Sequence, residues 1–295
     1  MSDARVGHMR TVAAVIVTYD NEAMLERLLN DLAAQTVLLH EIFVMDNSVN
    51  GRTARLMKER FPQVRYTGFR VNRGSAGGYH EGIRQAIETK DLVWLFDDDV
   101  IVPPDSLENL LKGLERLDPR HTGCVVRSWC TGIRSFSQPE KMRGFAWRGT
   151  LIPAEIIRRV GLPRRDYFLY CDDTEYSMRI ADAGYPMYWI PDSLVLEQRQ
   201  SDRQDLALAG IHSRVYAAKE KLYYAFRNQF NLFMTKKMLC ALVRTLLYGL
   251  KVMTLIICSG GRGKRSRLAA VMRGLMDGAQ GRLGINPFYT PGENA

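Results

Sequence analysis

The sequence lacks the spaced cysteines of a zinc site or of a disulfide framework. Its five cysteines are odd in number and scattered, without a CxxC pair. A structural zinc ion and a set of disulfides are therefore both poorly supported, and a reducing compartment is expected. The N-terminus also lacks an apolar stretch before the first predicted strand, so we predict no secretory signal and a cytoplasmic protein.

Two common nucleotide-binding signatures are also missing. The chain contains no GK[ST] triplet, and the glycines of residues 72–82 do not have the GxGxxG spacing. These absences argue against a P-loop NTPase and against a dinucleotide-binding fingerprint. The glycines allow close approach of the backbone to another group. The stretch alone does not decide whether that group is a ligand or a packed helix.

Acidic residues are scarce in one part of the chain. Residues 214–273 hold thirteen Lys or Arg and a single Glu, whereas residues 1–213 hold 27 basic and 29 acidic residues. The body is therefore close to neutral, and the net charge of +9 comes from the C-terminal segment. A nucleic-acid-binding protein is expected to be basic more widely, so we predict no nucleic-acid partner.

The first half of the chain alternates short apolar runs with helical patterns. Strands are predicted at 12–19, 41–48, 64–69 and 92–100, and helices at 22–35, 51–60 and 106–117, with a glycine-rich turn entering a helix after residue 72. Alternation of this kind indicates βαβ units, and we predict an α/β fold with a mainly parallel sheet flanked by helices. A helix at 172–184 and a last strand at 185–191 follow. Beyond residue 202 the pattern is wholly helical.

Three adjacent carboxylates, Asp97, Asp98 and Asp99, stand at the end of the fourth predicted strand. Ligands of open α/β sheets bind at the carboxyl ends of the strands, and residues i and i+2 of an extended segment point the same way. Asp97 and Asp99 are therefore predicted to bind Mn²⁺ or Mg²⁺ together with a substrate diphosphate. Capping of the next helix is the alternative, but Asp105 or Ser106 already stands at that helix start.

A second acidic group, formed by Asp172, Asp173 and Glu175, stands at the start of a predicted helix. Acidic residues in this position favour the helix dipole, which is one explanation for them. The other explanation is a general base, because transfer of a group to a hydroxyl needs a carboxylate within hydrogen-bond reach. The residues alone leave both explanations open.

In their order and spacing, these motifs resemble glycosyltransferase family 2, whose members have the GT-A fold. The matching segments span roughly residues 11–200 and are VIVTYDN, VMDNS, NRGSAGGYHEG, WLFDDDV, GFAWRGTLIP and FLYCDDTEYSMRIADAGY. Within the family the chain looks most like bacterial galactofuranosyl- and rhamnosyltransferases. The resemblance implies inverting transfer of galactofuranose from UDP-galactofuranose to a surface-glycan or lipid-linked glycan acceptor. The alternative donor is dTDP-rhamnose.

The resemblance also implies roles for single residues. Those that would bind the donor, with Asp46 bonding the pyrimidine ring, are Thr18, Tyr19, Asp46, Asn72, Gly77 and Asp98. Asp173 would be the catalytic base with support from Asp172, and Trp147 and Glu175 would shape the acceptor site. Relatives often have a metal-binding histidine where this chain has Glu197, which would be a third oxygen ligand beside the two strand-end acids.

Residues 1–205 are predicted to form the catalytic domain, with donor binding in 11–100 and acceptor binding and catalysis in 121–205. Residues 206–295 are predicted to form a basic amphipathic helical region, where Lys237, Arg244 and Lys251 recur every seven residues among apolar residues. This pattern favours an in-plane helix on an anionic membrane surface, at the inner face of the plasma membrane. The alternative is that the apolar face packs on the catalytic domain or on a second copy of the chain.

Two other classes of protein share parts of this pattern. A metal-dependent nucleotidyltransferase has a nucleotide-binding sheet and acidic metal ligands, but usually a glycine- and basic-rich loop near the first strand, where this chain has TYDNE. A non-catalytic membrane-binding module would need only the basic segment. The full set of carboxylates in the body argues against it.

Overall fold

The computed structural model of the protein describes residues 10–130, 136–198, 203–208, 211–258 and 263–290. The chain divides into two compact units. The first is made of Met1–Asn72, Gly78–Pro163 and Tyr176–Arg199, and the second of Arg73–Gly77, Arg164–Glu175 and Gln200–Ala295. The second unit thus includes two short internal segments, which the division predicted at residue 205 did not foresee.

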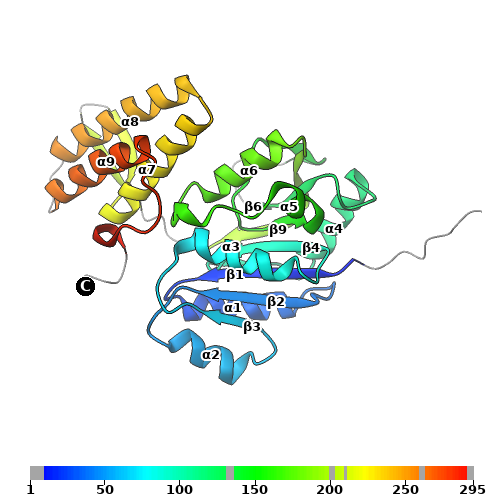
Figure 1. Cartoon of the computed structure of the whole chain (residues 1–295). Helices are drawn as coiled ribbons and strands as arrows, with labels where there is room; N and C mark the ends of the chain where they lie inside the picture. Colours follow the sequence, from blue (N-terminus) through cyan, green and yellow to red (C-terminus); the bar gives the residue numbers. More distant parts are fainter. Residues whose placement is uncertain (1–9, 131–135, 199–202, 209–210, 259–262, 291–295) are drawn as a thin grey trace, which may run out of the picture. The chain divides into compact units, whose positions relative to one another are not determined.

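The first unit is built on a sheet that includes the interior strand β1 (Val12–Thr18), which is buried along all seven residues. It pairs in parallel with β2 (Glu41–Asp46) and β4 (Leu92–Asp97), and β3 (Arg65–Gly68) pairs in parallel with β2 (Figure 1). A strand buried on both faces has a continuous apolar sequence, which explains the run VAAVIV.

The far half of the sheet is mixed in direction. β8 (Thr150–Pro153) is antiparallel to β4 and to β6 (Val125–Cys130), whereas β9 (Met187–Glu197) is parallel to β6. The short strands β5 (Val100–Ile101) and β7 (Glu140–Lys141) are both antiparallel to β9. The order is β3-β2-β1-β4-β8-β6-β9-β5, with β7 off this path. The predicted α/β fold with a mostly parallel sheet is confirmed.

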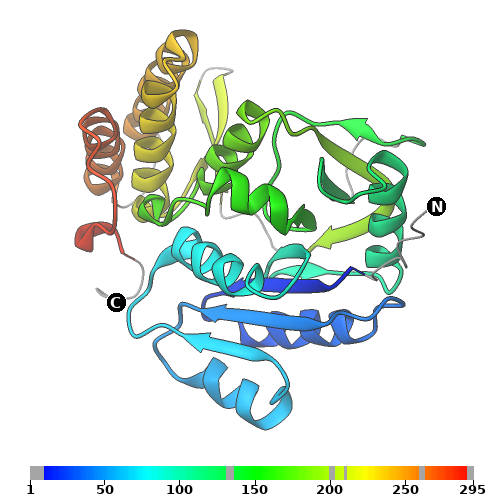
Figure 2. The same ribbon diagram turned by 45° about the vertical axis from the view of Figure 1, so that its right-hand side comes forward.

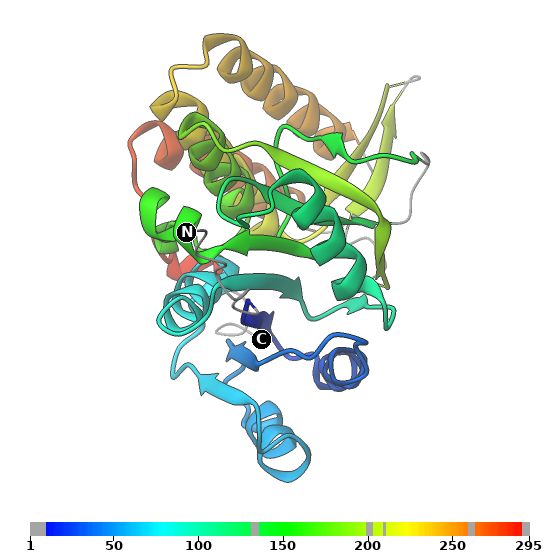
Figure 3. The same ribbon diagram turned by 90° about the vertical axis from the view of Figure 1, so that its right-hand side faces the viewer.

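Helices cover both faces of this sheet (Figure 3). One face buries apolar side chains of α1 (Glu22–Ala33), α2 (Arg52–Arg60) and α4 (Ser106–Leu117). The other buries those of α3 (Gly74–Ala86), α5 (Ala154–Val160) and α6 (Asp172–Asp182). The leucine periodicity of residues 106–117 predicted α4 with the same bounds.

The acidic end of β4 differs from the extended segment predicted through residue 100. The strand ends at Asp97, and Asp98 and Asp99 form a turn before β5. The alternation argument for a shared direction of Asp97 and Asp99 was therefore wrong. The capping argument was also wrong, because Asp105 stands at the N-cap of α4 without a side-chain capping bond. Its carboxylate instead accepts a hydrogen bond from Asn109 at 3.0 Å.

The second unit contains the helices α7 (Lys219–Thr235), α8 (Leu239–Cys258) and α9 (Lys264–Ala279), and the short turns η1 (Arg165–Tyr167) and η2 (Pro287–Tyr289). It also contains an antiparallel hairpin of β10 (Arg203–Leu208) and β11 (Ile211–Tyr216) (Figure 2). The prediction that residues beyond 202 are wholly helical was therefore wrong. The buried Leu206 and Val215 stand among more exposed residues, so the alternation of the hairpin left a weak apolar signal.

The basic stripe predicted in this unit is incomplete. Lys237 precedes α8, which begins at Leu239, and Lys251 donates from its ammonium group to the carbonyl of His212 at 2.8 Å. Of the three lysines and arginines, only Arg244 is an exposed residue of α8. Among the described residues, α8 is the one helix long and apolar enough to span a membrane by length and composition, with 28% of its apolar window buried.

Candidate active site

Asp98 organises the end of β1. Its carboxylate accepts hydrogen bonds from the Thr18 hydroxyl at 2.6 Å, the Asn21 amide at 2.8 Å and the Tyr19 backbone N–H at 3.3 Å. Burial raises the pKa of Asp98 to about 6, and the neighbouring Asp99 adds to the rise while the bonds from Thr18 and Asn21 oppose it. Asp98 therefore fixes the loop after β1, in which Tyr19 remains 37% exposed.

A second buried carboxylate, Asp46, stands at the end of β2. One of its oxygens accepts from the backbone N–H of Ser48 at 2.8 Å, and the other from the Tyr66 hydroxyl at 2.8 Å. Burial and this bond to Asp46 raise the pKa of Tyr66 above its ordinary value. Ser48 also accepts from the backbone of Asp20 at 2.8 Å, which ties the loop after β2 to the loop after β1. Asp46 is thus held in one orientation beside Thr18.

Asp97 is supported by an aromatic layer below the strand end. The Tyr79 hydroxyl of α3 donates to its carboxylate at 2.8 Å. The ring of Tyr79 stacks on Trp147, with centroids 4.5 Å apart and an interplanar angle of 26°. Trp147 is 3% exposed and belongs to the core, so a direct contact with an acceptor would require it to leave this stack. The side chain holds Tyr79 in place, and Tyr79 in turn orients Asp97.

The three-ligand metal set predicted from the sequence is not assembled. Among the described residues, no group of three or more His, Cys, Asp and Glu is placed to hold a metal ion. Glu197 instead accepts a hydrogen bond from Arg148 at 2.7 Å. Burial lowers the pKa of Arg148, but the charges of Glu197, Asp97 and Asp99 outweigh it and raise that pKa overall.

This electrostatic balance bears on whether a cation fits. The guanidinium of Arg148 lies in the field of both strand-end acids, and its Nε is buried without a hydrogen-bond partner among the described residues. The negative charges are those of Asp97 and Asp99, which both act on Arg148, and a bound cation would neutralise them as well. Mg²⁺ and Mn²⁺ typically take one or two carboxylates from a protein and complete their shell with substrate phosphates. Asp97 and Asp99 fit that donor set.

The glycine turn before and within α3 packs against protein at several of its positions. Gly74 has a φ of +69°, and a Cβ there would clash with the carbonyl of Phe168. A Cβ at Gly78 or at Gly82 would meet side chains of β1, and at Gly77 it would meet the Cβ of Arg73. Close packing therefore accounts for these glycines. Asn72 is half-buried at the start of the turn.

The acids of α6 differ in exposure. Asp172 is 3% exposed and accepts from the Ser75 hydroxyl at 3.3 Å, and Glu175 is 5% exposed. Asp173 is half-buried, and one of its oxygens accepts from the backbone and hydroxyl of Thr174, at 2.6 and 3.1 Å. Asp173 is therefore the member of this group that a substrate reaches most readily. All three belong to the second unit, whereas the acids after β4 belong to the first.

Four of the residues described above were not predicted from the sequence. They are the tyrosines and donors that orient the predicted acids, namely Asn21, Tyr66, Tyr79 and Arg148. Asn21 falls in the stretch TYDNE directly after the first predicted strand, so its position in the sequence gave a local signal. Tyr66, Tyr79 and Arg148 contact carboxylates that are 18 to 49 residues away in the sequence, so no local pattern predicted these contacts.

Curated relatives match most of the chain. The galactofuranosyltransferase GlfT1 of Mycobacterium tuberculosis is 27% identical over 245 residues, which cover 74% of this chain and 81% of the relative. GlfT1 of Mycolicibacterium smegmatis is 26% identical over 250 residues, covering 75% of this chain and 82% of the relative.

Solved structures share the fold at low sequence identity. GalNAc-T7 with UDP, GalNAc and Mn²⁺ has a TM-score of 0.60 at 14% identity, over 77% of this chain and about half, 48%, of that one. The mannosyltransferase PcManGT of Pyrobaculum calidifontis, in complex with GDP-Man and Mn²⁺, has a TM-score of 0.54 at 18% identity, over 95% of this chain and 78% of that one. These likenesses show a glycosyltransferase fold of the GT-A type.

The family follows from a match over more than half of the sequence. The profile of Glycosyl transferase family 2 matches residues 13–174, which include β1 from its second residue on, the acids at the end of β4 and the first residues of α6. This match favours glycosyl transfer over the nucleotidyl transfer and the non-catalytic membrane module that the sequence left as alternatives. The chain therefore belongs to Glycosyl transferase family 2.

Proposed function

We propose that the protein transfers galactofuranose from UDP-galactofuranose to a hydroxyl of a lipid-linked or surface glycan, with inversion at the anomeric carbon. The observation that carries this proposal is the exposure pattern on α6, where Asp173 is accessible beside the buried Asp172 and Glu175. The galactofuranosyltransferases among the relatives support the choice of sugar.

Asp173 is the proposed general base. In a single displacement the acceptor hydroxyl attacks the anomeric carbon from the face opposite the diphosphate, and its proton passes to a carboxylate oxygen of Asp173. A positioned base of this kind typically contributes about 10²–10⁴-fold to the rate. Asp172, which accepts from Ser75, supports the geometry of the first turn of α6.

The ends of β1 and β2 are the proposed nucleoside site. Asp46 is held by Ser48 and Tyr66 so that its carboxylate accepts a hydrogen bond from the N–H of the pyrimidine ring. Tyr19 offers an exposed ring next to Thr18 for contact with the base. Asp98 acts through Thr18 and Asn21, because its carboxylate accepts hydrogen bonds from the last residue of β1 and from the loop that follows it.

Asp97 and Asp99 are the proposed ligands of Mn²⁺ or Mg²⁺. A bound divalent cation supplies Lewis-acid stabilisation of the charge that develops on the leaving diphosphate. Tyr79 orients the carboxylate of Asp97 for this role. Arg148, which lies in the field of both acids, is a second positive group for the same phosphates and keeps Glu197 paired.

The exposed face of α8 is the proposed contact with an anionic membrane. Its apolar residues recur every three or four positions, as on one side of a helix, and are Leu239, Val243, Leu246, Leu247, Leu250 and Ile257. The exposed cations Lys237 and Arg244 flank this face. An apolar face beside cations matches a surface of anionic headgroups, on which a lipid-linked acceptor would also be presented.

The transfer reaction is tested with labelled nucleotide sugars. The full-length protein is incubated with UDP-galactofuranose, UDP-galactose, dTDP-rhamnose or GDP-mannose, with Mn²⁺ and a membrane extract containing lipid-linked glycans. We expect label to move from UDP-galactofuranose into the glycan fraction. Transfer only from dTDP-rhamnose would replace the donor, and pyrophosphate exchange without glycan labelling would contradict the proposal.

The membrane contact is tested by flotation with vesicles of phosphatidylglycerol and phosphatidylcholine. We expect the wild type to float with anionic vesicles, and the variant Leu247→Gln/Leu250→Gln to stay in solution. The matched control is Leu38→Gln/Val71→Gln, which changes exposed apolar residues of the first unit. A wild-type protein that stays off the vesicles and sediments as a dimer would contradict the proposal, because a second copy would then cover the face.

A further inference from the structure

The segment that leads into the acids of α6 has an unusual backbone. Residues 167–171, called the strap below, belong to the second unit. Phe168 has φ +64° and ψ −63°, and the backbone N–H of Leu169 donates to the carbonyl of Tyr167 at 2.7 Å. This is a γ-turn of the rare, strained hand. Tyr170 and Cys171 follow with φ values of +68° and +61°.

Three of five residues of the strap thus adopt a backbone that L side chains rarely take, and none of the three is glycine. Each such residue costs free energy, and the conformation persists only where surrounding groups determine it. Phe168 is 1% exposed and packs on Tyr224 of α7, with ring centroids 4.7 Å apart. The strap is therefore held from α7.

Asn228 of α7 makes the central contact with the strap. Its side-chain NH₂ group lies 2.8 Å from the carbonyl of Tyr167, 2.8 Å from that of Leu169 and 2.9 Å from that of Tyr170, so its two hydrogens are shared among three acceptors. The side chain is completely buried. The side chain of Asn228 thus links three backbone carbonyls around the γ-turn.

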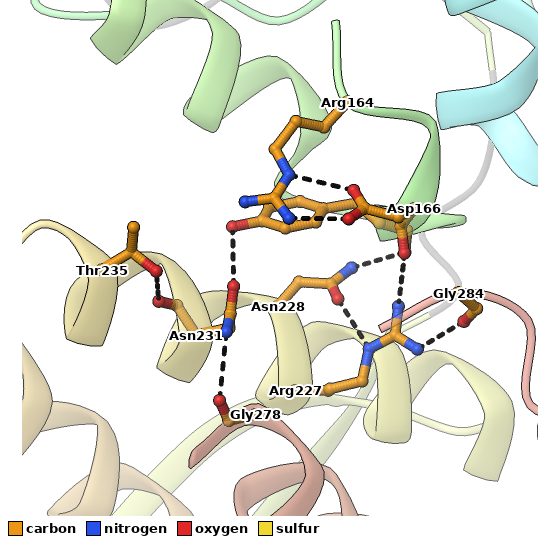
Figure 4. A network of polar contacts seen from close by, with 9 residues as sticks. Arg164, Asp166, Arg227, Asn228, Asn231, Thr235, Gly278 and Gly284 are labelled. Carbon is orange, nitrogen blue, oxygen red and sulfur yellow. Dashed lines mark hydrogen bonds and ion pairs between the residues drawn. The ribbon is translucent and has the colours of Figure 1, made fainter. Parts of the chain in front are cut away.

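Arg227 fixes the orientation of that amide (Figure 4). Its Nε donates to Oδ1 of Asn228 at 2.8 Å, so that the NH₂ group of Asn228 faces the strap. Its Nη2 donates to the carbonyl of Tyr167 at 2.8 Å, and its Nη1 to the carbonyl of Gly284 at 2.6 Å. The guanidinium is 1% exposed and lies 4.6 Å above the ring of Tyr224.

The strap in turn sets the start of α6. The carbonyl of Cys171, its last residue, accepts from the backbone N–H of Glu175 at 2.8 Å and closes the first turn of the helix. The carbonyl of Phe168 accepts from Ala76 at 3.1 Å, next to Ser75, which donates to Asp172. A change in the strap therefore moves the first turn of α6 and the acids on it.

We propose that Arg227 and Asn228 are positioning residues, which hold the strap so that the carboxylate of Asp173 is kept where the transfer reaction needs it. This role rests on the proposed function of Asp173 as general base. A contribution to fold stability explains this buried Arg–Asn pair less well than a positioning role does. Buried ion pairs can often be replaced by apolar residues of similar volume without loss of stability, so a buried charge is weak evidence for a purely stabilising role. A strained backbone segment next to a reacting group keeps its conformation only where hydrogen-bond donors from neighbouring elements hold its carbonyls in place.

The variant Asn228→Asp isolates the donated bonds. An aspartate has nearly the same shape and still accepts from Arg227, but its carboxylate has no hydrogen to give to the three carbonyls. The matched control is Asn231→Asp, one turn along α7, where the amide donates to the carbonyl of Gly278 at 3.2 Å and to none of the strap carbonyls. Oδ1 of Asn231 accepts from the Tyr167 hydroxyl at 3.4 Å, and an aspartate keeps that acceptor. A milder variant, Arg227→Lys, keeps the positive charge and loses the planar fork.

Two measurements are made on the full-length variants. Hydrogen exchange of the amides of residues 168–175 reports the strap directly. Turnover with UDP-galactofuranose, and binding of UDP with Mn²⁺ by calorimetry, separate the chemical step from donor binding. We expect Asn228→Asp to speed exchange in this segment and to lower kcat about 10- to 100-fold, since small misplacements of a reacting group cost that much. UDP affinity is expected to stay within about twofold of the wild type.

The order of the variants decides between positioning and plain stability. Positioning predicts that kcat falls from wild type and Asn231→Asp through Arg227→Lys to Asn228→Asp, with strap exchange rising in the same order. Equal losses of kcat and of melting temperature in Asn228→Asp and Asn231→Asp would overturn it, as would unchanged strap exchange in Asn228→Asp. If Asn228→Asp does not fold, Arg227→Lys against Asn231→Asp makes the same comparison.

Failure of the proposed function gives a different result. If Asp173→Asn turns over as fast as the wild type, Asp173 is not the base, and the reason for holding it in place disappears. Strap exchange would still report whether Arg227 and Asn228 hold residues 168–175. If Asp173→Asn loses turnover but Asn228→Asp keeps a normal kcat, the positioning role is overturned and the role of Asp173 as base stands.

Discussion

In the first unit a buried acid gathers donors, whereas in the second unit a buried amide gathers acceptors. Asp98 accepts from Thr18, Tyr19 and Asn21 and fixes the loop after β1. Asn228 donates to three carbonyls of the strap. Each of the two side chains has three hydrogen-bonding partners and holds a segment next to a proposed functional residue.

The difference between them is charge. Burial raises the pKa of Asp98 to about 6, so its interactions respond to pH near neutrality. Asn228 carries no titratable group, and it contacts the strap through neutral amide hydrogens. The proposed donor side of the enzyme is therefore expected to be sensitive to protonation and to cations. The strap is expected to be indifferent to both.

The largest effect is expected from Asp173→Asn, on the strap side of this comparison. Loss of a general base lowers turnover by about 10²–10⁴-fold. Affinity for UDP with Mn²⁺ is expected to stay unchanged, because the proposed nucleoside residues belong to the first unit. Turnover comes from labelled-sugar transfer and affinity from calorimetry. Asp182→Asn, at the other end of α6, is the control. Normal turnover in Asp173→Asn would assign the base to Asp172 or Glu175.

The next effect is expected from metal removal, which acts on the donor side alone. Excess EDTA is predicted to lower transfer on the order of 10²-fold or more, because several kcal/mol of leaving-group stabilisation is lost. Added Mn²⁺ restores it. Asp99→Asn is expected to weaken Mn²⁺ binding in the presence of UDP, measured by electron paramagnetic resonance. Full activity in excess EDTA would contradict the proposed role of a divalent cation in the transfer.

A smaller effect is expected from Asp98→Asn. Asparagine offers one acceptor oxygen where the carboxylate offers two, so the loop after β1 loses part of its anchoring. We predict about tenfold weaker UDP binding, since a hydrogen bond to a charged group is worth about 1.5–3 kcal/mol. Strap exchange is expected to stay unchanged. Wild-type UDP affinity in this variant would place Asp98 outside donor binding.

The same variant tests the pH response. The pKa of Asp98 lies above its ordinary value of 3.8, so the folded protein binds more protons than the unfolded chain between about pH 4 and 6. The contribution of Asp98 to the free energy of unfolding therefore falls as pH rises through this window. Urea unfolding at several pH values is expected to show the free energy of unfolding of the wild type falling relative to that of Asp98→Asn as pH rises through this window. Parallel pH curves would contradict the raised pKa.

The smallest effect is expected from Tyr66→Phe. The phenol donates one hydrogen bond to Asp46, and Ser48 donates to the other carboxylate oxygen. Loss of one such bond is worth about 1 kcal/mol, which corresponds to about fivefold weaker UDP binding. Calorimetry with UDP checks this value. A loss as large as that of Asp98→Asn would mean that Tyr66 contacts the nucleotide itself.

The sequence predicted the first unit far better than the second. Continuous apolar strands and the leucine spacing of α4 are local patterns, and they predicted β1, β2, β4 and α4 closely. The acids at the end of β4 and at the start of α6 were found for the same reason. Their orientation was not found, because the turn at Asp98 depends on bonds from Thr18, 80 residues earlier.

The second unit depends on contacts that no short window contains. Asn228 reaches carbonyls 58 to 61 residues earlier in the sequence, and backbone carbonyls have no sequence signature. The residues FLYC gave no sign of positive φ values, since such values are expected at glycine. The helical pattern predicted beyond residue 202 agrees with α7, but it gave no indication that α7 holds the strap.

The central claim is a single displacement with Asp173 as base, and the anomeric configuration of the product tests it most directly. The glycan made from UDP-galactofuranose is purified, and the anomeric proton and carbon of the new residue are read by nuclear magnetic resonance. The account predicts a configuration opposite to that of the donor sugar. A retained configuration would contradict it, because retention does not arise from one attack opposite the leaving diphosphate.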